Sequence, residues 1–398
     1  MKEAITTKRK HRVHLYEIDF MRIFFTFGVL FNHTVNQFTN AMIHDQTYET
    51  VRSLRVMFHF TRMGFIFISG VVLTLNYYNR NDWKTFFKKR FNGSLWPYLS
   101  WNALLMLLMI AIGGSIFSLG NFGSQYLTIV MHGSSFYMYY MLLVMQLYLV
   151  FPIVVWLFKK FADKHERILL ISFGCQLLIV LFIKFALPLF DKTNWPYWFK
   201  AVSVNIFAYQ FYVILGTYVC LHYQATYDFL QKNIRKLGLL AFLMAIGMIF
   251  YFRIWNQQIL KLDTNHALSL HQPYIACYDT VMLLVIYWIG KKYAQYRAKY
   301  GFSKWFENSA NNLVKVSYGL YLTQTIGLLC VKYLLKSLQL SNLLLAILIP
   351  IGWMLVILVS FLIAWACYKI PPFGFLIGRP NVHLVTEKNF LIQKREKL

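Results

Sequence analysis

An arginine and a histidine stand eleven residues apart in one apolar stretch near the start of the chain. Arg22 lies toward one end of residues 16–37 and His33 toward the other. In an α-helix this step turns about 1100°, or about 20° past three full turns, so both side chains project from one face about 16 Å apart. A guanidinium and an imidazole on one helix face can bind an anionic group and move a proton.

The position of Arg22 inside an apolar helix needs a physical reason. An arginine within a membrane-spanning helix costs at least about 2.5 kcal/mol, and such residues usually face a bundle interior or an aqueous cavity. The alternative is structural: Arg22 reaches toward the inner membrane surface and pairs with Asp19, while His33 satisfies a helix end. Under the first interpretation, this helix forms one wall of a path across the bilayer.

The composition is typical of a polytopic membrane protein. Of the 398 residues, 58% are hydrophobic and only 14% are charged, which leaves too little polar surface for a soluble globule. We predict an all-α fold with about ten transmembrane helices. They are expected near residues 16–37, 54–79, 94–116, 136–158, 168–188, 201–222, 237–255, 273–290, 314–336 and 342–367.

The distribution of positive charge predicts the topology. The chain ends and alternate loops, with the adjoining helix ends, hold 29 of the 40 Lys and Arg residues, and the other loops hold 8. Positive charge marks the cytoplasmic side, so both termini are predicted to be cytoplasmic. The net charge of +25 is then explained by contact with anionic lipid, and no nucleic acid partner is expected. The same basic rim would attract a coenzyme A nucleotide.

We predict a single membrane-embedded domain over residues 1–370, followed by a short basic cytoplasmic tail over residues 371–398. No internal repeat or second domain is visible. The five cysteines are scattered singly and show no Cys-x-x-Cys spacing, which argues against a disulfide framework and a zinc site. We therefore expect no metal and assign the cysteines to packing.

The predicted topology brings a second set of ionisable residues to the depth of His33. The first span runs outward, and the second runs inward with His59 and Arg62 in its outer half. Asp279 lies about six residues below the outer end of the eighth span. A carboxylate that orients a histidine is a common way to build a general base, and a buried Asp279 needs a partner. Arg62 and His33 are equally good candidates for that partner.

Five short motifs occur in order over most of the chain. They are Asp-Phe-Met-Arg at 19–22 with Asn-His at 32–33, Phe-Ile-Phe-Ile-Ser-Gly at 65–70, Lys-Lys-Arg-Phe at 88–91 with Trp-Pro-Tyr at 96–98, Gln-Leu-Tyr at 146–148 with Phe-Pro at 151–152, and Ser-Tyr-Gly-Leu-Tyr-Leu at 317–322. This series resembles the acyltransferase-3 family of integral membrane acyltransferases, which modify cell-envelope glycans. In that family the Arg-x10-His pair of the first span is the functional signature.

Three positions depart from the family pattern. Many relatives have a second arginine three residues after the one that matches Arg90, and this chain has Gly93 there. The late motif often ends in histidine, and here that position is Gln324. The start of the fourth span often contains histidine and tryptophan, and here it reads Tyr-Met-Tyr-Tyr at 137–140. The chain therefore resembles a divergent branch of the family.

The resemblance implies transfer of an acyl group, commonly acetyl, from cytoplasmic acyl-CoA to a hydroxyl of an extracytoplasmic cell-envelope glycan. In that reaction His33 is the general base, or accepts the acyl group itself, and Arg22 stabilises the donor phosphates or the thioester oxyanion. We assign catalytic roles to His33, Arg22 and Asp279. Residues assigned to substrate binding are Arg62, His59, Arg90, Ser69, Tyr318 and Gln324. Acyl-CoA is a substrate, and no bound cofactor is expected.

Other functions also fit the residues. Some relatives carry an extracellular hydrolase-like domain that completes the transfer, and we expect none here. The acceptor would then reach the cell membrane as a lipid-linked or teichoic-type glycan, or receive the acyl group through a separate extracytoplasmic partner. The main alternative is an exporter of an envelope polysaccharide or lipid-linked precursor, which would catalyse no acyl transfer. A structural membrane partner is a third hypothesis, in which neutral replacements of Arg22 and His33 are harmless.

Overall fold

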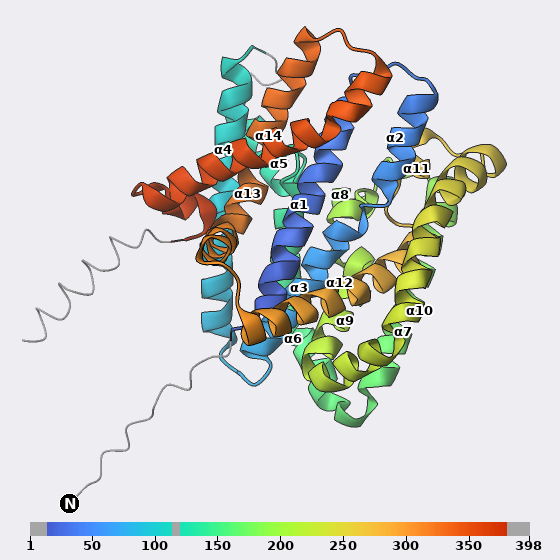
Figure 1. The fold of residues 1–398 in the computed structure, drawn as a ribbon, viewed down its shortest axis with the longest axis vertical. Coiled ribbons are helices and arrows are strands. Elements are labelled where there is room, and N and C mark those ends of the chain that lie inside the picture. The colour runs from blue at the N-terminus through green and yellow to red at the C-terminus, as the bar shows by residue number, and fades with distance from the viewer. Residues whose placement is uncertain (1–13, 114–119, 380–398) are drawn as a thin grey trace, which may run out of the picture.

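The computed structural model describes residues 14–113 and 120–379, and every regular element in these ranges is helical (Figure 1). The α-helices are α1 (Tyr16–Thr39), α2 (Gln46–Val56), α3 (Phe60–Tyr77), α4 (Trp83–Ala111), α5 (Phe122–His132), α6 (Tyr139–Lys160), α7 (His165–Leu181), α8 (Tyr197–Lys200), α9 (Gln210–Leu221), α10 (Tyr223–Phe250), α11 (Thr264–Ala267), α12 (Pro273–Tyr300), α13 (Lys304–Ser337) and α14 (Asn342–Lys369). The shorter 3-10 and π segments are η1 (Ala162–Lys164), η2 (Phe182–Ala186), η3 (Leu187–Leu189), η4 (Val202–Val204), η5 (Ile206–Tyr209), η6 (Tyr251–Ile259) and η7 (Phe373–Ile377).

Eight helical segments in the described part of the chain are long and apolar enough to cross a membrane. They are residues 46–77, 83–111, 139–160, 162–189, 223–259, 273–300, 304–337 and 342–369. The prediction of an all-α polytopic membrane protein is therefore confirmed. Two of the ten expected spans fall outside this set. One is α1, whose polar residues lower its hydropathy, and the other is the short apolar helix Ile206–Leu221.

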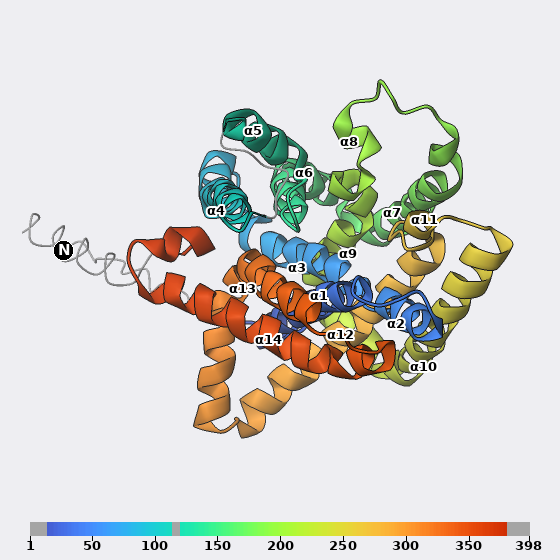
Figure 2. The same ribbon diagram turned by 90° about the horizontal axis from the view of Figure 1, so that it is seen from above.

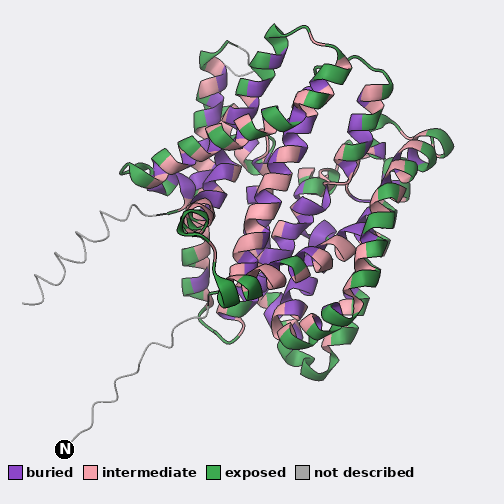
Figure 3. Ribbon diagram, viewed as in Figure 1, coloured by how far each residue is buried: buried purple, intermediate pink, exposed green. Residues whose placement is uncertain are grey.

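Helix α1 lies inside the bundle. It packs against α3, α12, α13 and α14 and lies among other helices in two perpendicular views (Figures 1 and 2). Figure 3 shows buried residues concentrated on α1 and α3, whereas α10 is mostly exposed. In the apolar window of α13, 72% of the residues are buried, against 17% in that of α10. The polar first helix is thus shielded from lipid by its neighbours.

The second expected span, over residues 54–79, is two helices. Helix α2 ends at Val56 and α3 begins at Phe60, with His59 immediately before it. The sequence between the two helices contains neither Gly nor Pro, the residues that usually mark such a break. His59 therefore lies at the start of α3. We expected His59 and Arg62 to lie one turn apart within one continuous helix, and the structure does not have that helix.

Two glycines allow α3 and α9 to approach closely. A Cβ added to Gly216 would lie 2.2 Å from the carbonyl oxygen of Phe67, and one added to Gly70 would lie 2.6 Å from that of Val213. Small residues permit this kind of backbone contact between membrane helices. The glycine of the Ser-Gly motif at 69–70 therefore has a packing role.

Lys184 ties together two π segments and the start of α12. Its ammonium donates to the Tyr251 hydroxyl (2.7 Å), to Asn256 Oδ1 (2.7 Å) and to Gln272 Oε1 (3.0 Å). These bonds use all three donors of the ammonium group. No described carboxylate lies within 4.0 Å of it. This charge, which the sequence placed inside a span, therefore has a structural role.

The beginning of the predicted tail packs into the helical domain. Segment η7 contacts α4, α13 and α14, and the Trp101 indole donates to the carbonyl oxygen of Leu376 (2.8 Å). Ile377 is buried beside it. The tail residues from 380 onward lie outside the described residues.

Candidate active site

His33 is buried on α1, where it lies against Tyr137. The imidazole and phenol ring centroids are 3.7 Å apart, and the ring planes are tilted by 35°. Tyr137 belongs to the segment immediately before α6, and the Tyr321 hydroxyl of α13 donates to its carbonyl oxygen. Three separate parts of the chain therefore fix the surroundings of the imidazole.

Arg62 of α3 is the central cation of the site. It is an electrostatic neighbour of both His33 and Asp279. Its guanidinium lies 5.0 Å from the ring centroid of Tyr139 and hydrogen-bonds to Tyr209. No described carboxylate is within 4.0 Å of Arg62. Its charge is therefore available to stabilise an oxyanion that forms beside His33.

Arg55 is a second cation near His33, and two asparagines of α1 hold it. It donates to Asn32 Oδ1 (3.2 Å) and to Asn36 Oδ1 (2.5 Å), and the Asn32 amide donates to the carbonyl oxygen of Arg55 (3.2 Å). Asn32 and Asn36 are four residues apart and so share a helix face. In the Asn-His pair of the first motif, Asn32 therefore helps to hold Arg55, and His33 is the candidate base.

Asp279 is fully buried in α12, but neither expected partner pairs with it. The Tyr212 hydroxyl of α9 donates to its Oδ2 (3.3 Å), and its Oδ1 has no hydrogen-bond partner among the described residues. No ion pair within 4.0 Å joins it to Arg62 or His33 in that part of the chain. The structure therefore corrects the expected pairing, because a tyrosine from another helix takes the partner's place. Arg62 is an electrostatic neighbour of Asp279.

His59 shares a small cavity with His33 and Arg62. The cavity measures about 20 Å³, which is room for about one water molecule. A second cavity of the same size lies between His33, Arg62 and the tyrosines at 137, 139, 140 and 321. His59 Nδ1 is buried without a hydrogen-bond partner among the described residues. The site is closed in this structure, and side chains must move before a sugar can reach the imidazole.

Arg22 lies near the opposite end of α1 from His33. It forms an ion pair with Asp19 (3.5 Å), and its side chain is 31% exposed. The same carboxylate contacts His14, and Arg379 is a further electrostatic neighbour of Arg22. The pairing expected under the structural interpretation is thus present. The partial exposure leaves the guanidinium accessible to an anionic group.

Arg90 and Tyr318 approach one another around Tyr148. Each is an electrostatic neighbour of Tyr148, and the guanidinium of Arg90 lies 4.9 Å from the ring centroid of Tyr77. Arg90 Nε and the Tyr318 hydroxyl are buried without a hydrogen-bond partner in the described residues. Buried polar atoms are normally paired, so these two suit a binding role.

Gly93 is not required by packing. A Cβ added to Gly93 would meet no atom within 4 Å. The close approach is at Gly378, where an added Cβ would lie 2.6 Å from the carbonyl oxygen of Gly93. Gly378 has φ of 64°, a backbone conformation that favours glycine. The structure therefore leaves open space for the start of a side chain at position 93, where the resemblance led us to expect an arginine.

A row of tyrosines joins the surroundings of Arg90 to those of His33. Tyr140 is an electrostatic neighbour of both Tyr148 and Tyr139, and it hydrogen-bonds with Ser69. Its ring centroid lies 5.7 Å from that of Tyr321, the residue that bonds to the segment carrying Tyr137. Ser69 therefore lies beside the middle of this row. Its hydroxyl also donates to a backbone carbonyl one turn earlier (2.8 Å).

Gln324 is completely buried in α13, three residues after Tyr321. Neither its amide nitrogen nor its amide oxygen has a hydrogen-bond partner among the described residues. An unpaired buried polar group costs about 1–3 kcal/mol. Stability therefore does not account for this residue, and a binding role suits it better.

The described residues contain no group of three or more His, Cys, Asp or Glu side chains that could hold a metal ion. All five cysteines are free thiols. The groups gathered near His33 are arginines and tyrosines, which bind anions and donate hydrogen bonds.

A family model described as an acyltransferase domain matches residues 15–369. The chain belongs to the acyltransferase-3 family. The matched region begins one residue before α1 and ends with α14, so it takes in the whole helical bundle. With its membrane-spanning helices, the chain is a membrane acyltransferase. No curated protein and no solved structure is significantly similar to it.

This acyltransferase-3 site also contains residues that the sequence alone did not single out. In the sequence Tyr137 stands out only as part of an unusual aromatic segment, and that segment is the signal for its contact with His33. The sequence alone assigns Arg55 to a loop or helix end, because nothing in it marks the end of α2. Tyr212 could not be paired with Asp279, since the two residues are 67 positions apart.

Proposed function

We propose that this acyltransferase moves an acyl group, commonly acetyl, from cytoplasmic acyl-CoA to a hydroxyl of an extracytoplasmic cell-envelope glycan. It would then be an O-acyltransferase of the cell membrane. The observation that carries the proposal is the row of partly buried tyrosines between Arg90 and His33. This row offers a route by which an acyl-pantetheine arm crosses part of the bilayer.

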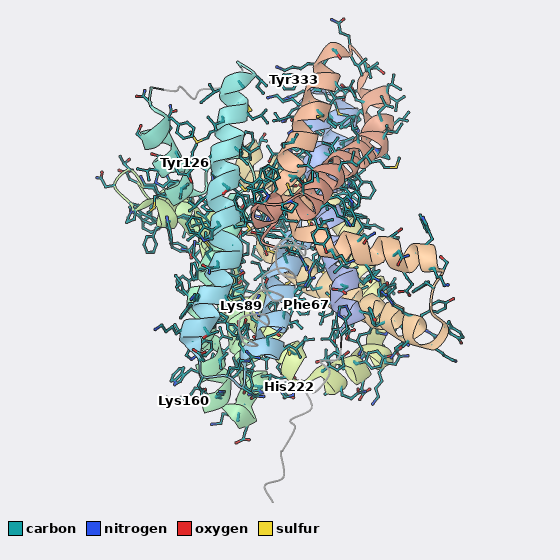
Figure 4. All side chains as sticks on the ribbon, turned by 90° about the vertical axis from the view of Figure 1, so that its left-hand side faces the viewer. Phe67, Lys89, Tyr126, Lys160, His222 and Tyr333 are labelled. Carbon is teal, nitrogen blue, oxygen red and sulfur yellow. The ribbon has the colours of Figure 1, made fainter. Side chains whose placement is uncertain are left out.

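The donor would bind at the basic end of the bundle. Lys160 and His222 lie at one end of the molecule and Tyr333 at the other (Figure 4). Charge-assisted hydrogen bonds from Arg22 and Arg90 suit the phosphates of coenzyme A. The surrounding positive charge raises the local concentration of such an anion.

The acceptor would react beside His33. Its hydroxyl oxygen attacks the thioester carbonyl carbon, the new C–O bond forms, and the C–S bond breaks. His33 takes the hydroxyl proton and returns it to the departing coenzyme A thiolate. Arg62 and Arg55 stabilise the oxyanion formed on the carbonyl oxygen. The same position also allows His33 to accept the acyl group first and pass it to the hydroxyl.

Acyl-CoA consumption tests this proposal. Purified protein in lipid nanodiscs is incubated with labelled acetyl-CoA and membranes from cells that lack the gene, and both free coenzyme A and labelled glycan are measured. We expect both products from the native protein and neither from His33→Ala or Arg22→Ala. His266→Ala, which changes an exposed histidine far along the chain, is the control.

The experiment separates the proposal from its alternatives. An exporter or a structural partner would consume no acyl-CoA, so an absence of coenzyme A release from native protein sinks the proposal. Full activity of both His33→Ala and Arg22→Ala would leave acyl transfer standing and overturn the residue assignment. Mass analysis of envelope polymers with and without the gene identifies the glycan that gains the acyl group.

A further inference from the structure

A cavity of about 510 Å³ opens where the C-terminal ends of α1 and α13 meet the segment before α6. Its polar lining consists of Gln37, Asn40, Tyr137, Thr325, Lys332 and Lys336. The cavity is large enough for a sugar unit, in contrast to the two small spaces directly beside His33. It therefore offers a place where an acceptor can wait next to the closed site.

Thr325 gives the inner part of the cavity a buried hydrogen-bonding group. Its side chain is only 2% exposed, and its hydroxyl has no hydrogen-bond partner among the described residues. Threonine hydroxyls in helices usually bond to a carbonyl one turn earlier, as Thr323 and Thr26 do in this protein. Thr325 is thus free to bond with a ligand in the cavity.

The cavity is connected to the candidate base through Tyr137. This residue lines the cavity and also lies against His33, with ring centroids 3.7 Å apart. Gln37, one helical turn beyond His33, hydrogen-bonds with Tyr137 and lines the same cavity. A ligand here is therefore separated from the imidazole by one aromatic ring.

Two cations lie at the exposed part of the cavity. Lys332 and Lys336 are four residues apart on α13, so they share a helix face, and both are exposed. No described carboxylate is within 4.0 Å of either ammonium group. Lys336 lies over the ring of Tyr333 (5.9 Å), and Tyr333 is at the opposite end of the molecule from Lys160 (Figure 4). A pair of uncompensated lysines recognises an oxyanion such as phosphate or carboxylate.

We propose that this cavity holds the acceptor and selects a glycan that carries an anionic group, phosphate or carboxylate, within reach of the hydroxyl to be acylated. Lys332 and Lys336 bind the anionic group, and Thr325 bonds to the sugar. Tyr137 separates the waiting acceptor from His33 until the small spaces beside the imidazole widen. The inference rests on the proposed function, because it assigns the cavity to the acceptor of that reaction.

The test compares lysine variants in the nanodisc assay described above. We expect Lys332→Gln/Lys336→Gln to raise the KM for the acceptor membranes by about tenfold or more, because both charged contacts are lost. Lys332→Arg/Lys336→Arg keeps the charge and should restore a near-native KM. Lys192→Gln/Lys261→Gln removes the same charge elsewhere in the chain and should leave acylation unchanged. Each variant should elute from size-exclusion chromatography at the same volume as the native protein, which excludes misfolding.

Inorganic phosphate serves as a second probe. It should inhibit acylation by the native protein competitively with the acceptor. The paired Gln variant should weaken that inhibition several-fold, whereas Thr325→Val, which changes the group assigned to the sugar, should leave it unchanged. Unchanged acceptor KM and unchanged phosphate inhibition in the paired Gln variant overturn the inference, as does an acylated product without phosphate or carboxylate. If native protein releases no coenzyme A, the proposed function itself has failed.

The product fraction distinguishes two sources of the anionic group. Acyl label in the organic extract identifies a lipid-linked or phospholipid headgroup acceptor, whereas label retained in the polymer fraction identifies an anionic polymer. Both results support an anionic acceptor, provided that the paired Gln variant lowers the label in that fraction.

Discussion

The imidazole of His33 and the phenol of Tyr137 lie against one another, with ring centroids 3.7 Å apart and ring planes tilted by 35°. This contact joins the first helix to the segment that begins the fourth predicted span. It also places an aromatic ring between the candidate base and the cavity of about 510 Å³. We therefore expect Tyr137 both to position the imidazole and to limit access to it.

Substitution of Tyr137 should separate these two roles. Tyr137→Phe keeps the ring against His33, and we expect near-native kcat with a modest rise in acceptor KM from loss of the bond with Gln37. Tyr137→Ala removes the ring, and kcat should fall by about 100-fold because the imidazole is no longer held in place. Steady-state kinetics of acyl transfer measure both. Equal kcat for the Phe and Ala variants would rule out a positioning role.

Arg55 should not be replaceable by lysine. Its guanidinium bonds to two asparagines through different nitrogens, a geometry that a single ammonium group does not reproduce. We expect Arg55→Lys to lower kcat by about tenfold or more while the protein remains folded, because one asparagine loses its partner. The matched control is Arg253→Lys, because Arg253 also donates to two side chains, those of Ser53 and Thr50, but lies outside the site. Native kcat in Arg55→Lys would contradict the clamp.

The two kinds of glycine in this bundle should respond oppositely to substitution. Gly216→Ala places a methyl group 2.2 Å from a backbone oxygen of α3, so we expect loss of the folded particle in size-exclusion chromatography. In Gly93→Arg the new Cβ meets open space, and the helix gains propensity of about 0.8 kcal/mol. It should fold normally and lower the KM for acyl-CoA if the position contributes to phosphate binding. Misfolding of Gly93→Arg is the result that would count against the packing described for α4.

Lys184 should matter for stability and not for catalysis. Lys184→Met keeps the length of the side chain but removes three hydrogen bonds, after which Gln272 Oε1 keeps only the bond from the Asn256 amide. The expected loss in free energy of unfolding is about 1–3 kcal/mol, seen as a lower Tm in detergent, with kcat unchanged at low temperature. Lys192→Met, at a surface loop, should leave the Tm unchanged. A native Tm for Lys184→Met would show that the three bonds contribute nothing.

His271 should make the protein less stable in acid. Burial lowers the pKa of His271, which lies in the segment before α12, to about 3, with Arg62 adding to the effect. The unfolded side chain titrates near about 6.5, so between these values the unfolded state binds a proton that the folded state does not. Stability contributed by the neutral form is therefore lost as pH falls from about 6.5 toward about 3.

The measurement is the Tm of native protein and of His271→Gln between neutral pH and about pH 4.5. We expect the native Tm to fall more steeply than that of the variant, because glutamine has no proton to bind in this range. Parallel curves for the two proteins would show that His271 does not contribute to acid sensitivity.

The sequence predicted the helical architecture because long apolar runs dominate it. Helices at the expected places of α4, α6, α12, α13 and α14 follow from runs of about 20 apolar residues. The division of the second span could not be predicted, since no Gly or Pro marks it and the clamp around Arg55 is formed by a different helix. Helix α5 was also not predicted, because 11 residues are too few for a span.

The candidate site was predictable only along single helices. Helical spacing placed Arg22 and His33 on one face of α1, and the order of the family motifs indicated Ser69, Arg90 and Tyr318. The partners of these residues come from distant segments. Tyr212 bonds to Asp279 and Tyr137 contacts His33, and no local pattern specifies which helices meet.

The burial of α1 has a consequence for how the protein is made. Among the described helices α1 is synthesised before the others, yet its polar residues make it less apolar than the helices that are long and apolar enough to cross a membrane. Its position depends on α3, α12, α13 and α14, and the last two of these are synthesised after all the other described α-helices. Helix α1 must therefore wait for α13 and α14 before its surroundings are complete, and shortened chains that lack these two helices should leave α1 exposed to quality-control proteases.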